Sequence, residues 1–212
     1  MPQSTPLTIP SPIEIKRLPW MRRLSLISPK LSHLLTVFSY GSLNLWAFIE
    51  SHPAITSFCE YPGYVIIDDQ QVFATFWVQG DGQQQFLVLE GDIQIEPENI
   101  NSVPTFHDAA VHTVTQAWLA SHQQWINNWH RINPYIVSNG RFVTPQILDA
   151  TAVLFETPVT LFDAEHALRR IDQQLVRTAI FMLLHRGRIT SADLTKKPLS
   201  GATLFYSNAA RA

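Results

Sequence analysis

Acidic side chains are the candidates for chemistry in the middle of this chain, and no cation accompanies them. Residues 31–130 contain ten carboxylates and no lysine or arginine. Among the ten are the adjacent pair Asp68-Asp69 and the alternating pair Glu90 and Asp92. Alternate residues of a strand share one face, so Glu90 and Asp92 have the spacing of two ligands for a divalent cation such as Mg²⁺. With one further carboxylate they would form the metal site of a phosphodiester hydrolase.

A structural interpretation of the same carboxylates is favoured over this metal site. Asp68-Asp69 fits a solvated turn, and Glu90-Gly91-Asp92 fits the end of a strand. Either Glu50 or Glu60 could supply the further carboxylate of such a site. Most sites of phosphoryl transfer also use a Lys or Arg side chain to stabilise the negative charge that develops in the transition state, and residues 31–130 contain neither. A metal site rearranged around these carboxylates stays open as an alternative.

The charge distribution places any contact with DNA at the two ends of the chain. Formal charge is +4 over residues 1–30, −10 over residues 31–130 and +4 over residues 131–212. An acidic segment repels a polyanion, whereas lysine and arginine neutralise phosphates. The residues predicted to contact DNA are Arg22, Arg23, Arg186, Arg188, Lys196 and Lys197.

Several other classes of protein are disfavoured by what the sequence lacks. Cys59 is the single cysteine, which excludes an intrachain disulfide and fits a reducing cytoplasm. The eight histidines are scattered without the spacing of a zinc site, and no P-loop or nucleophile motif occurs. No apolar run reaches eighteen residues, so no membrane span is expected. We therefore predict no cofactor, unless the metal alternative holds.

Hydrophobic patterning predicts an α/β fold that positions these residues. The leader 1–13 is rich in proline and is expected to be flexible. A short helix is expected over 42–49, and Asp81-Gly82 is a strong signal for a β-hairpin. The remaining predictions are a basic, strand-like stretch over 15–30, strands over 54–61, 64–67, 72–78, 85–90 and 135–137, and helices over 108–129 and 144–155.

The C-terminal block has the outline of a winged-helix module. Asp163 is expected to cap a helix over 163–171, and a second helix is expected over 173–185, stopped by Gly187. A short strand and a basic turn follow. The predicted organisation is thus a core over 14–157 and a winged-helix-like domain over 158–212.

Read in order, the motifs of this chain resemble those of the TnsA-type endonuclease subunit of heteromeric bacterial transposases. The resemblance spans roughly residues 20–206, and it depends on the order and spacing of the motifs together. They are Ser28-Pro29-Lys30, Phe48-Ile49-Glu50-Ser51-His52-Pro53, Phe58-Cys59-Glu60-Tyr61-Pro62, Leu183-Leu184-His185-Arg186-Gly187-Arg188-Ile189, Ala192-Asp193-Leu194 and Pro198-Leu199. The family counterparts of the motifs that contain Glu50 and Glu60 are structural, so the resemblance implies a place in the scaffold for both.

The resemblance implies a restriction-endonuclease-like core of the PD-(D/E)xK type, a mixed sheet flanked by helices. In that family a helix Glu, a strand Asp and a second-strand Glu or Gln hold divalent metal, and a Lys two residues later orients water. Carried over by position, these four fall on Ser42, Thr75, Leu89 and Gly91. None of the four has the required chemistry, so the resemblance implies a catalytic site that has been lost.

The predicted function is therefore that of a non-catalytic architectural or adaptor subunit of a transposition complex. Its partners would be the DDE-type transposase subunit, the regulator ATPase and the DNA of the transposon ends. Two alternatives stay open. One is an active Mg²⁺-dependent endonuclease that makes the 5′-end cut with a migrated site. The other is a DNA-binding regulator that uses its winged helix alone.

Overall fold

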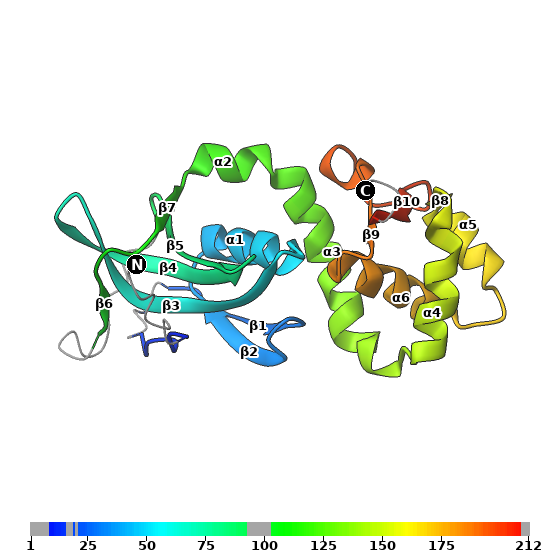
Figure 1. Ribbon diagram of the computed structural model, residues 1–212, viewed down its shortest axis with the longest axis horizontal. Helices are drawn as coiled ribbons and strands as arrows, with labels where there is room; N and C mark the ends of the chain where they lie inside the picture. The colour runs from blue at the N-terminus through cyan, green and yellow to red at the C-terminus, as the bar shows by residue number, and fades with distance from the viewer. Residues whose placement is uncertain (1–8, 16–18, 20, 93–102, 209–212) are drawn as a thin grey trace, which may run out of the picture. The chain divides into compact units, whose positions relative to one another are not determined.

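The computed structural model describes residues 9–15, 19, 21–92 and 103–208 and contains a mixed five-stranded sheet and a C-terminal set of helices (Figure 1). In chain order the elements are β1 (Leu24–Ser28), β2 (His33–Val37), α1 (Tyr40–Ser51), β3 (Ile55–Ile67), β4 (Gln70–Gly80), β5 (Gln83–Leu89), β6 (Thr105–Phe106), β7 (Val111–Val114), α2 (Gln116–Ser121), α3 (Gln123–Asn139), η2 (Gly140–Phe142), α4 (Pro145–Val153), η3 (Leu154–Glu156), β8 (Val159–Thr160), α5 (Leu161–Ala167), α6 (Gln173–His185), β9 (Ile189–Thr190), η4 (Asp193–Thr195) and β10 (Leu204–Ser207).

The chain divides into two compact units, each with residues from several segments. The sheet unit comprises Met1–Leu26, Leu35–Leu43 and Ile55–Gln116. The helical unit comprises Ile27–Leu34, Asn44–Ala54 and Ala117–Ala212. Helix α1 therefore contributes its first turn to the sheet unit and its remaining residues to the helical unit.

The sheet unit contains a five-stranded sheet in the order β6-β3-β4-β5-β7 (Figure 1). Its centre is formed by the long antiparallel strands β3, β4 and β5. The outer strands β6 and β7 run parallel to β3 and β5 respectively. Phe76 and Trp77, adjacent on β4, are both fully buried, so both faces of the sheet are covered. The α/β class with a mixed sheet is as predicted.

Two tight turns set the register of the central strands. Gly80 pairs with Gln83 across Asp81 and Gly82, whose φ angles are 49° and 73°. Positive φ at both central positions is the type I′ conformation, so the predicted hairpin is confirmed. Asp68-Asp69 forms a second such turn, with φ angles of 49° and 62°, as the solvated-turn interpretation predicted.

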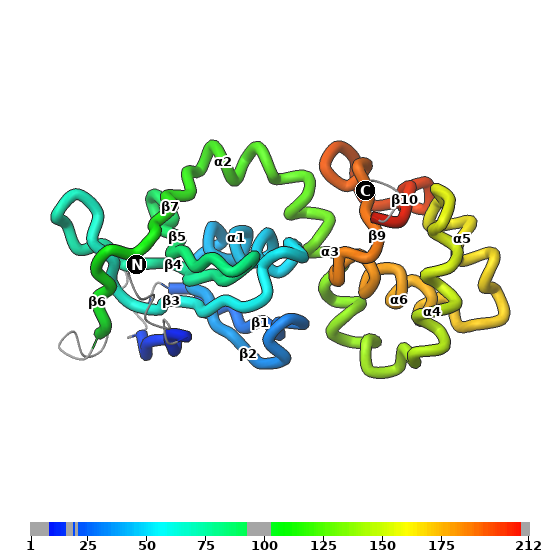
Figure 2. The backbone as a smooth tube through the Cα atoms, in the orientation of Figure 1, coloured from blue at the N-terminus to red at the C-terminus, as the bar shows by residue number. Residues whose placement is uncertain are grey.

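Helix α6 is the centre of the helical unit, and Figure 2 traces α3, α4 and α5 around it. Its apolar residues share a core with Trp129 and Ile132 of α3 and with Leu148 of α4. The helix begins after the N-cap Asp172 and ends at His185, followed by Gly187 with φ of 67°. Both predicted ends of this helix are confirmed.

A three-stranded sheet of the order β8-β10-β9 completes the helical unit, with both pairings antiparallel. Helix α5 starts at Leu161, two residues earlier than predicted, because Thr160 is its N-cap. The Thr160 hydroxyl accepts a hydrogen bond from the Asp163 N–H and donates one to the Asp163 carboxylate. Asp163 is therefore not the N-cap itself but the partner of the N-cap residue in the first turn. The helix also ends at Ala167, well short of the predicted residue 171.

Two predicted elements were wrong. The single helix over 108–129 is instead strand β7, helix α2 and the first part of α3, because Val111–Val114 pairs with β5 and extends the sheet. The predicted strand 135–137 lies inside α3, whose buried Ile132 and Ile136 face the helical core one turn apart. Packing at helical spacing outweighs the strand propensity of Tyr135, Ile136 and Val137.

Most of the predicted leader lies outside the described residues. Within the basic stretch 15–30, Lys16 and Arg17 also lie outside them, while Leu24–Ser28 forms strand β1. The predicted helices over 42–49 and 144–155 correspond to α1 and α4. The predicted strands over 54–61 and 64–67 are one continuous strand, β3, with a register shift between Glu60 and Gly63.

Candidate functional site

Three of the four positions at which the resemblance implies catalytic groups lie in the sheet unit on α1, β4 and β5, and two of them are hydrogen-bonded to each other. Ser42 lies in the first turn of α1, and Thr75 and Leu89 lie on the neighbouring strands β4 and β5. All three are buried. The backbone N–H of Leu89 donates to the Thr75 hydroxyl at 3.0 Å. A Cβ added at Gly41 would lie only 2.8 Å from Leu89 Cδ2, so this turn of α1 rests on the Leu89 side chain.

The fourth position, Gly91, follows the end of β5 and faces open space. Its φ of 67° is in the left-handed region, and nothing lies within 4 Å of an added Cβ. A side chain here would be strained and would not share the strand face of Leu89. Gly91 therefore ends the strand and reverses the chain toward Asp92.

Hydrogen bonds occupy the Ser42 hydroxyl. It donates to Asp92 Oδ2 at 2.7 Å, lies 2.9 Å from the Ser39 hydroxyl and lies 3.5 Å from the Tyr61 hydroxyl. The Ser39 hydroxyl in turn accepts the Ser42 N–H and caps the start of α1. Asp92 thus anchors the helix start to the end of β5. The sequence predicts Asp92 at a strand end or in a rearranged metal site and contains no signal for this contact.

Burial and two carboxylates set the electrostatics of this cluster. Burial, with Asp92 and Glu60 nearby, raises the pKa of Tyr61 well above its usual range, so the phenol keeps its proton. Burial and Glu60 likewise raise the pKa of the Cys59 thiol to about 12, which makes it a poor nucleophile. Across residues 9–15, 19, 21–92 and 103–208, no group of three or more His, Cys, Asp or Glu side chains is placed to hold a metal ion.

The hydroxyl of Thr75 supports the sheet, and its removal gives a direct test. Thr75→Val keeps the shape but leaves the buried Leu89 N–H without an acceptor, which we expect to cost about 1–3 kcal/mol of unfolding free energy. Thr75→Ser keeps the oxygen and should cost about 0.8 kcal/mol for the lost methyl group. Exchange of the Leu89 amide proton should speed up in the valine variant alone. Equal protection in both variants would contradict this role.

Glu50 is the centre of a second buried polar cluster, which belongs to the helical unit. Its carboxylate is fully buried and accepts hydrogen bonds from the Ser28 hydroxyl at 2.6 Å and the Lys30 N–H at 2.9 Å. His185 Nε2, at the end of α6, lies 2.8 Å from Glu50 Oε1. Every oxygen of this carboxylate is occupied by the scaffold, which agrees with the structural interpretation of Glu50.

Lys30 caps the C-terminal end of α1. Its ammonium donates to the carbonyls of Ile49, Glu50 and His52 at 2.7 to 2.9 Å. Cations are stabilising at this end of a helix because the last carbonyls have no partner within it. Burial nevertheless lowers the pKa of Lys30 to about 8, an effect that the Glu50 carboxylate opposes. The Ser28-Pro29-Lys30 and Phe48–Pro53 motifs are therefore in contact through this cluster.

The six basic residues predicted to contact DNA are all exposed. In the sheet unit, Arg22 donates to the Tyr40 hydroxyl at 2.6 Å and lies over the Tyr40 ring. In the helical unit, Arg186 is the C-cap of α6, and Lys197 lies 3.8 Å from Asp193. Because they are exposed, these side chains could contact phosphates. Exposure alone does not indicate DNA binding, since basic side chains that contact only water are exposed as well.

Helix α6, the second of the two C-terminal helices, presents little surface for reading bases. Its buried residues cover most of its length, from Val176 to Leu184. Gln173 and Gln174 are exposed in its first turn, whereas Arg177 is held by Glu165 through a two-point ion pair. A helix that enters the major groove needs a row of exposed polar side chains, which α6 lacks.

Comparisons with known proteins give no match for this chain. No family model matches the sequence, and no curated protein is similar to it. Within the described part of the chain, no helix combines the length and apolar character that crossing a bilayer requires.

Proposed function

We propose that this chain is a catalytically inactive, TnsA-like subunit of a multi-protein DNA transposition complex, acting in the cytoplasm. The observation that carries the proposal is the pairing of Thr75 with Leu89 on adjacent strands, with Gly41, the neighbour of Ser42 in the first turn of α1, close against the Leu89 side chain. By the resemblance, Ser42, Thr75 and Leu89 stand at the positions where a PD-(D/E)xK enzyme needs its acidic groups. These residues offer two occupied hydroxyls and a hydrocarbon side chain, which do not fit a divalent cation.

The strand arrangement supports a restriction-endonuclease-like core. An antiparallel β3-β4-β5 meander preceded by a helix, with a further strand parallel to β5, is the order expected of that fold. In such a core the metal ligands come from the helix and the two inner strands, as Ser42, Thr75 and Leu89 do by position.

The element order of the C-terminal segment supports a winged-helix-like module. Strand β8 precedes helices α5 and α6, and strands β9 and β10 follow them. In the small sheet, β10 lies between β8 and β9. Because α6 is largely buried, an adaptor role toward protein partners is favoured over base recognition by this helix. The DNA-binding regulator remains the weaker alternative.

The adaptor function is tested by assembly rather than by catalysis. The full chain, mixed with the transposase subunit and regulator ATPase encoded beside it, should bring both onto DNA that carries the transposon end. Omitting the chain should leave the two partners unlinked in a pull-down on that DNA. Recruitment of both partners to equal extent without the chain would contradict the proposal.

A mobility-shift experiment separates the adaptor from the regulator. If the chain is a regulator, it should bind end DNA alone with sequence preference, and affinity should fall steeply with salt. The adaptor proposal expects weak binding without sequence preference in the absence of partners. Changing Arg186 and Arg188 together to glutamine should weaken this binding without altering any sequence preference.

A further inference from the structure

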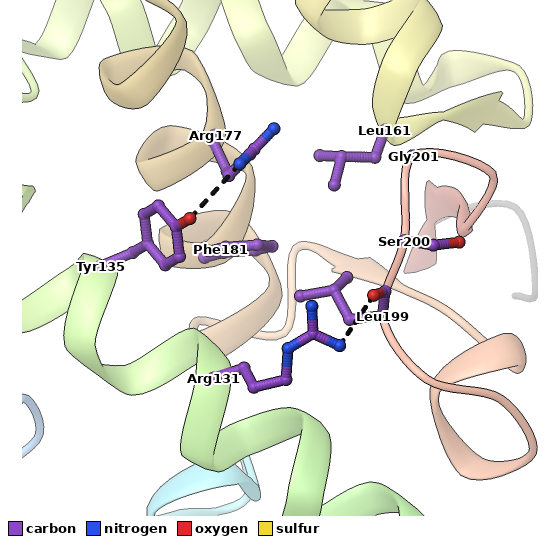
Figure 3. Close-up of a pocket in the computed structure, with 8 residues that line it drawn as sticks. All are labelled: Arg131, Tyr135, Leu161, Arg177, Phe181, Leu199, Ser200 and Gly201. Carbon is purple, nitrogen blue, oxygen red and sulfur yellow. Dashed lines mark hydrogen bonds between the residues drawn. The ribbon is translucent and has the colours of Figure 1, made fainter.

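A small pocket in the helical unit carries a positive charge that forms no ion pair with any carboxylate of the residues described by the structure. Its volume is about 220 Å³, and it lies between α3, α6, the start of α5 and the loop before β10. Figure 3 shows Arg131 approaching it from α3 and Arg177 from α6, with Leu199 and Ser200 on the loop side. None of these residues belongs to the clusters around Ser42 or Glu50.

The two arginines of this pocket differ in what holds them. Arg177 is neutralised, since its Nε and Nη2 donate to the Glu165 carboxylate and its Nη1 donates to the Tyr135 hydroxyl at 3.3 Å. Arg131 donates from Nη1 to the Leu199 carbonyl at 2.9 Å. Among the described residues, no Asp or Glu forms an ion pair with Arg131. A guanidinium has five N–H donors, so most of those of Arg131 remain for a ligand.

A second donor faces the same space. The Tyr135 hydroxyl accepts its hydrogen bond from Arg177, which leaves the phenolic proton available to another acceptor. The floor of the pocket is apolar, formed by the buried side chains of Leu161, Phe181 and Leu199. A cationic rim over an apolar floor suits a group that is anionic at one end and hydrocarbon at the other.

We infer that this pocket binds a carboxylate that carries a short apolar group, paired with Arg131 and hydrogen-bonded by Tyr135. One uncompensated positive charge matches a monoanion better than a doubly charged phosphate, whose remaining oxygens would lie against Leu161 and Phe181 without donors. The volume admits a few carbon atoms. The carboxylate could come from a free organic acid or from the C-terminal residue of another protein, and the experiment below distinguishes these sources.

The test is a titration of the full-length chain followed by amide chemical shifts in ¹H–¹⁵N spectra at constant ionic strength. The probes are butyrate, its neutral isostere butyramide, and inorganic phosphate. Butyrate should shift residues around the pocket with millimolar affinity, the range open to so small a ligand. Butyramide should bind at least about tenfold more weakly, because the charge-assisted pair is worth about 1.5–3 kcal/mol. Phosphate should also bind at least about tenfold more weakly, because its remaining oxygens would lie against apolar side chains without donors.

Variants locate the binding. Arg131→Gln should weaken butyrate binding roughly 10- to 100-fold, and Tyr135→Phe roughly 3- to 10-fold. Arg170→Gln, at an exposed arginine outside the pocket, is the matched control and should leave the affinity unchanged. Unchanged affinity in Arg131→Gln, equal binding of butyramide, tighter binding of phosphate, or no shifts with butyrate would each overturn the inference.

Two further probes identify the source of the carboxylate. A tripeptide that ends in leucine is compared with the same peptide carrying a C-terminal amide. Tighter binding of the free-acid peptide than of butyrate would support the chain end of a protein as the ligand. Tighter binding of butyrate would support a small organic acid. In both cases the Arg131→Gln variant must lose the interaction for the inference to stand.

Discussion

Replacing Glu50 with alanine should lower the unfolding free energy of the helical unit by about 3–5 kcal/mol, the effect of removing one partner from a buried ionic network. The change leaves the Ser28 hydroxyl, the Lys30 N–H and His185 Nε2 without their acceptor. It also removes the negative charge nearest the Lys30 ammonium. Since domains are stable by only about 5–15 kcal/mol, this is a large share of the total.

Urea unfolding followed by tryptophan fluorescence measures this loss. Trp46, Trp118, Trp125 and Trp129 lie in the helical unit and report on its transition. Glu156→Ala, at an exposed carboxylate of the same unit, is the matched control and should change stability by no more than about 0.5 kcal/mol. Equal effects of the two substitutions would show that the Glu50 cluster does not stabilise the fold.

Asn128→Ala is the second substitution with a large expected effect. The Asn128 amide group is almost fully buried and donates to the carbonyls of Leu194 and Lys197, both at 2.8 Å. Its oxygen accepts the Leu199 N–H at 2.8 Å. Three backbone groups of the loop before β10 thus lose their partners, at about 1–3 kcal/mol for each that stays buried. We expect a total loss of about 3–5 kcal/mol.

The adjacent residue provides a close control for Asn128. Asn127 is exposed and accepts one hydrogen bond from Gln123, so Asn127→Ala should cost less than about 0.5 kcal/mol. In Asn128→Ala, amide exchange should accelerate at Leu199. Intact protection of that amide, or equal unfolding midpoints for the two variants, would contradict the role of Asn128 in holding the loop.

The parts of the fold that were predictable are those in which local sequence and packing agree. Helix α6 has an Asp cap, apolar residues at helical spacing and a terminal glycine, and the Asp81-Gly82 turn joins two apolar antiparallel strands. Prediction failed where a distant partner decided the structure. Val111–Val114 becomes a strand because β5 offers an edge, and Tyr135 stays helical because α6 covers its neighbours.

The candidate site was only partly accessible from sequence. The resemblance singled out Ser42, Thr75 and Leu89 by position, and the structure pairs Thr75 with Leu89 and sets Gly41, the neighbour of Ser42, against Leu89. The contact between Ser42 and Asp92 joins residues fifty positions apart, and no spacing rule indicates it. The pocket at Arg131 is not predictable from the sequence, because its lining residues come from three helices and a loop. Taken singly, each has the character of an ordinary surface or core residue.

The proposed function requires that the scaffold be that of a nuclease and lack the groups that bind metal and activate water. The most direct measurement incubates the purified chain, with its partners, on end-bearing DNA with Mg²⁺ or Mn²⁺ and analyses the 5′ ends. We predict no cleavage at the transposon ends, in the wild type and equally in Glu90→Ala and Asp92→Ala. Site-specific cleavage by the wild type that either substitution abolishes would contradict the account and establish a migrated catalytic site.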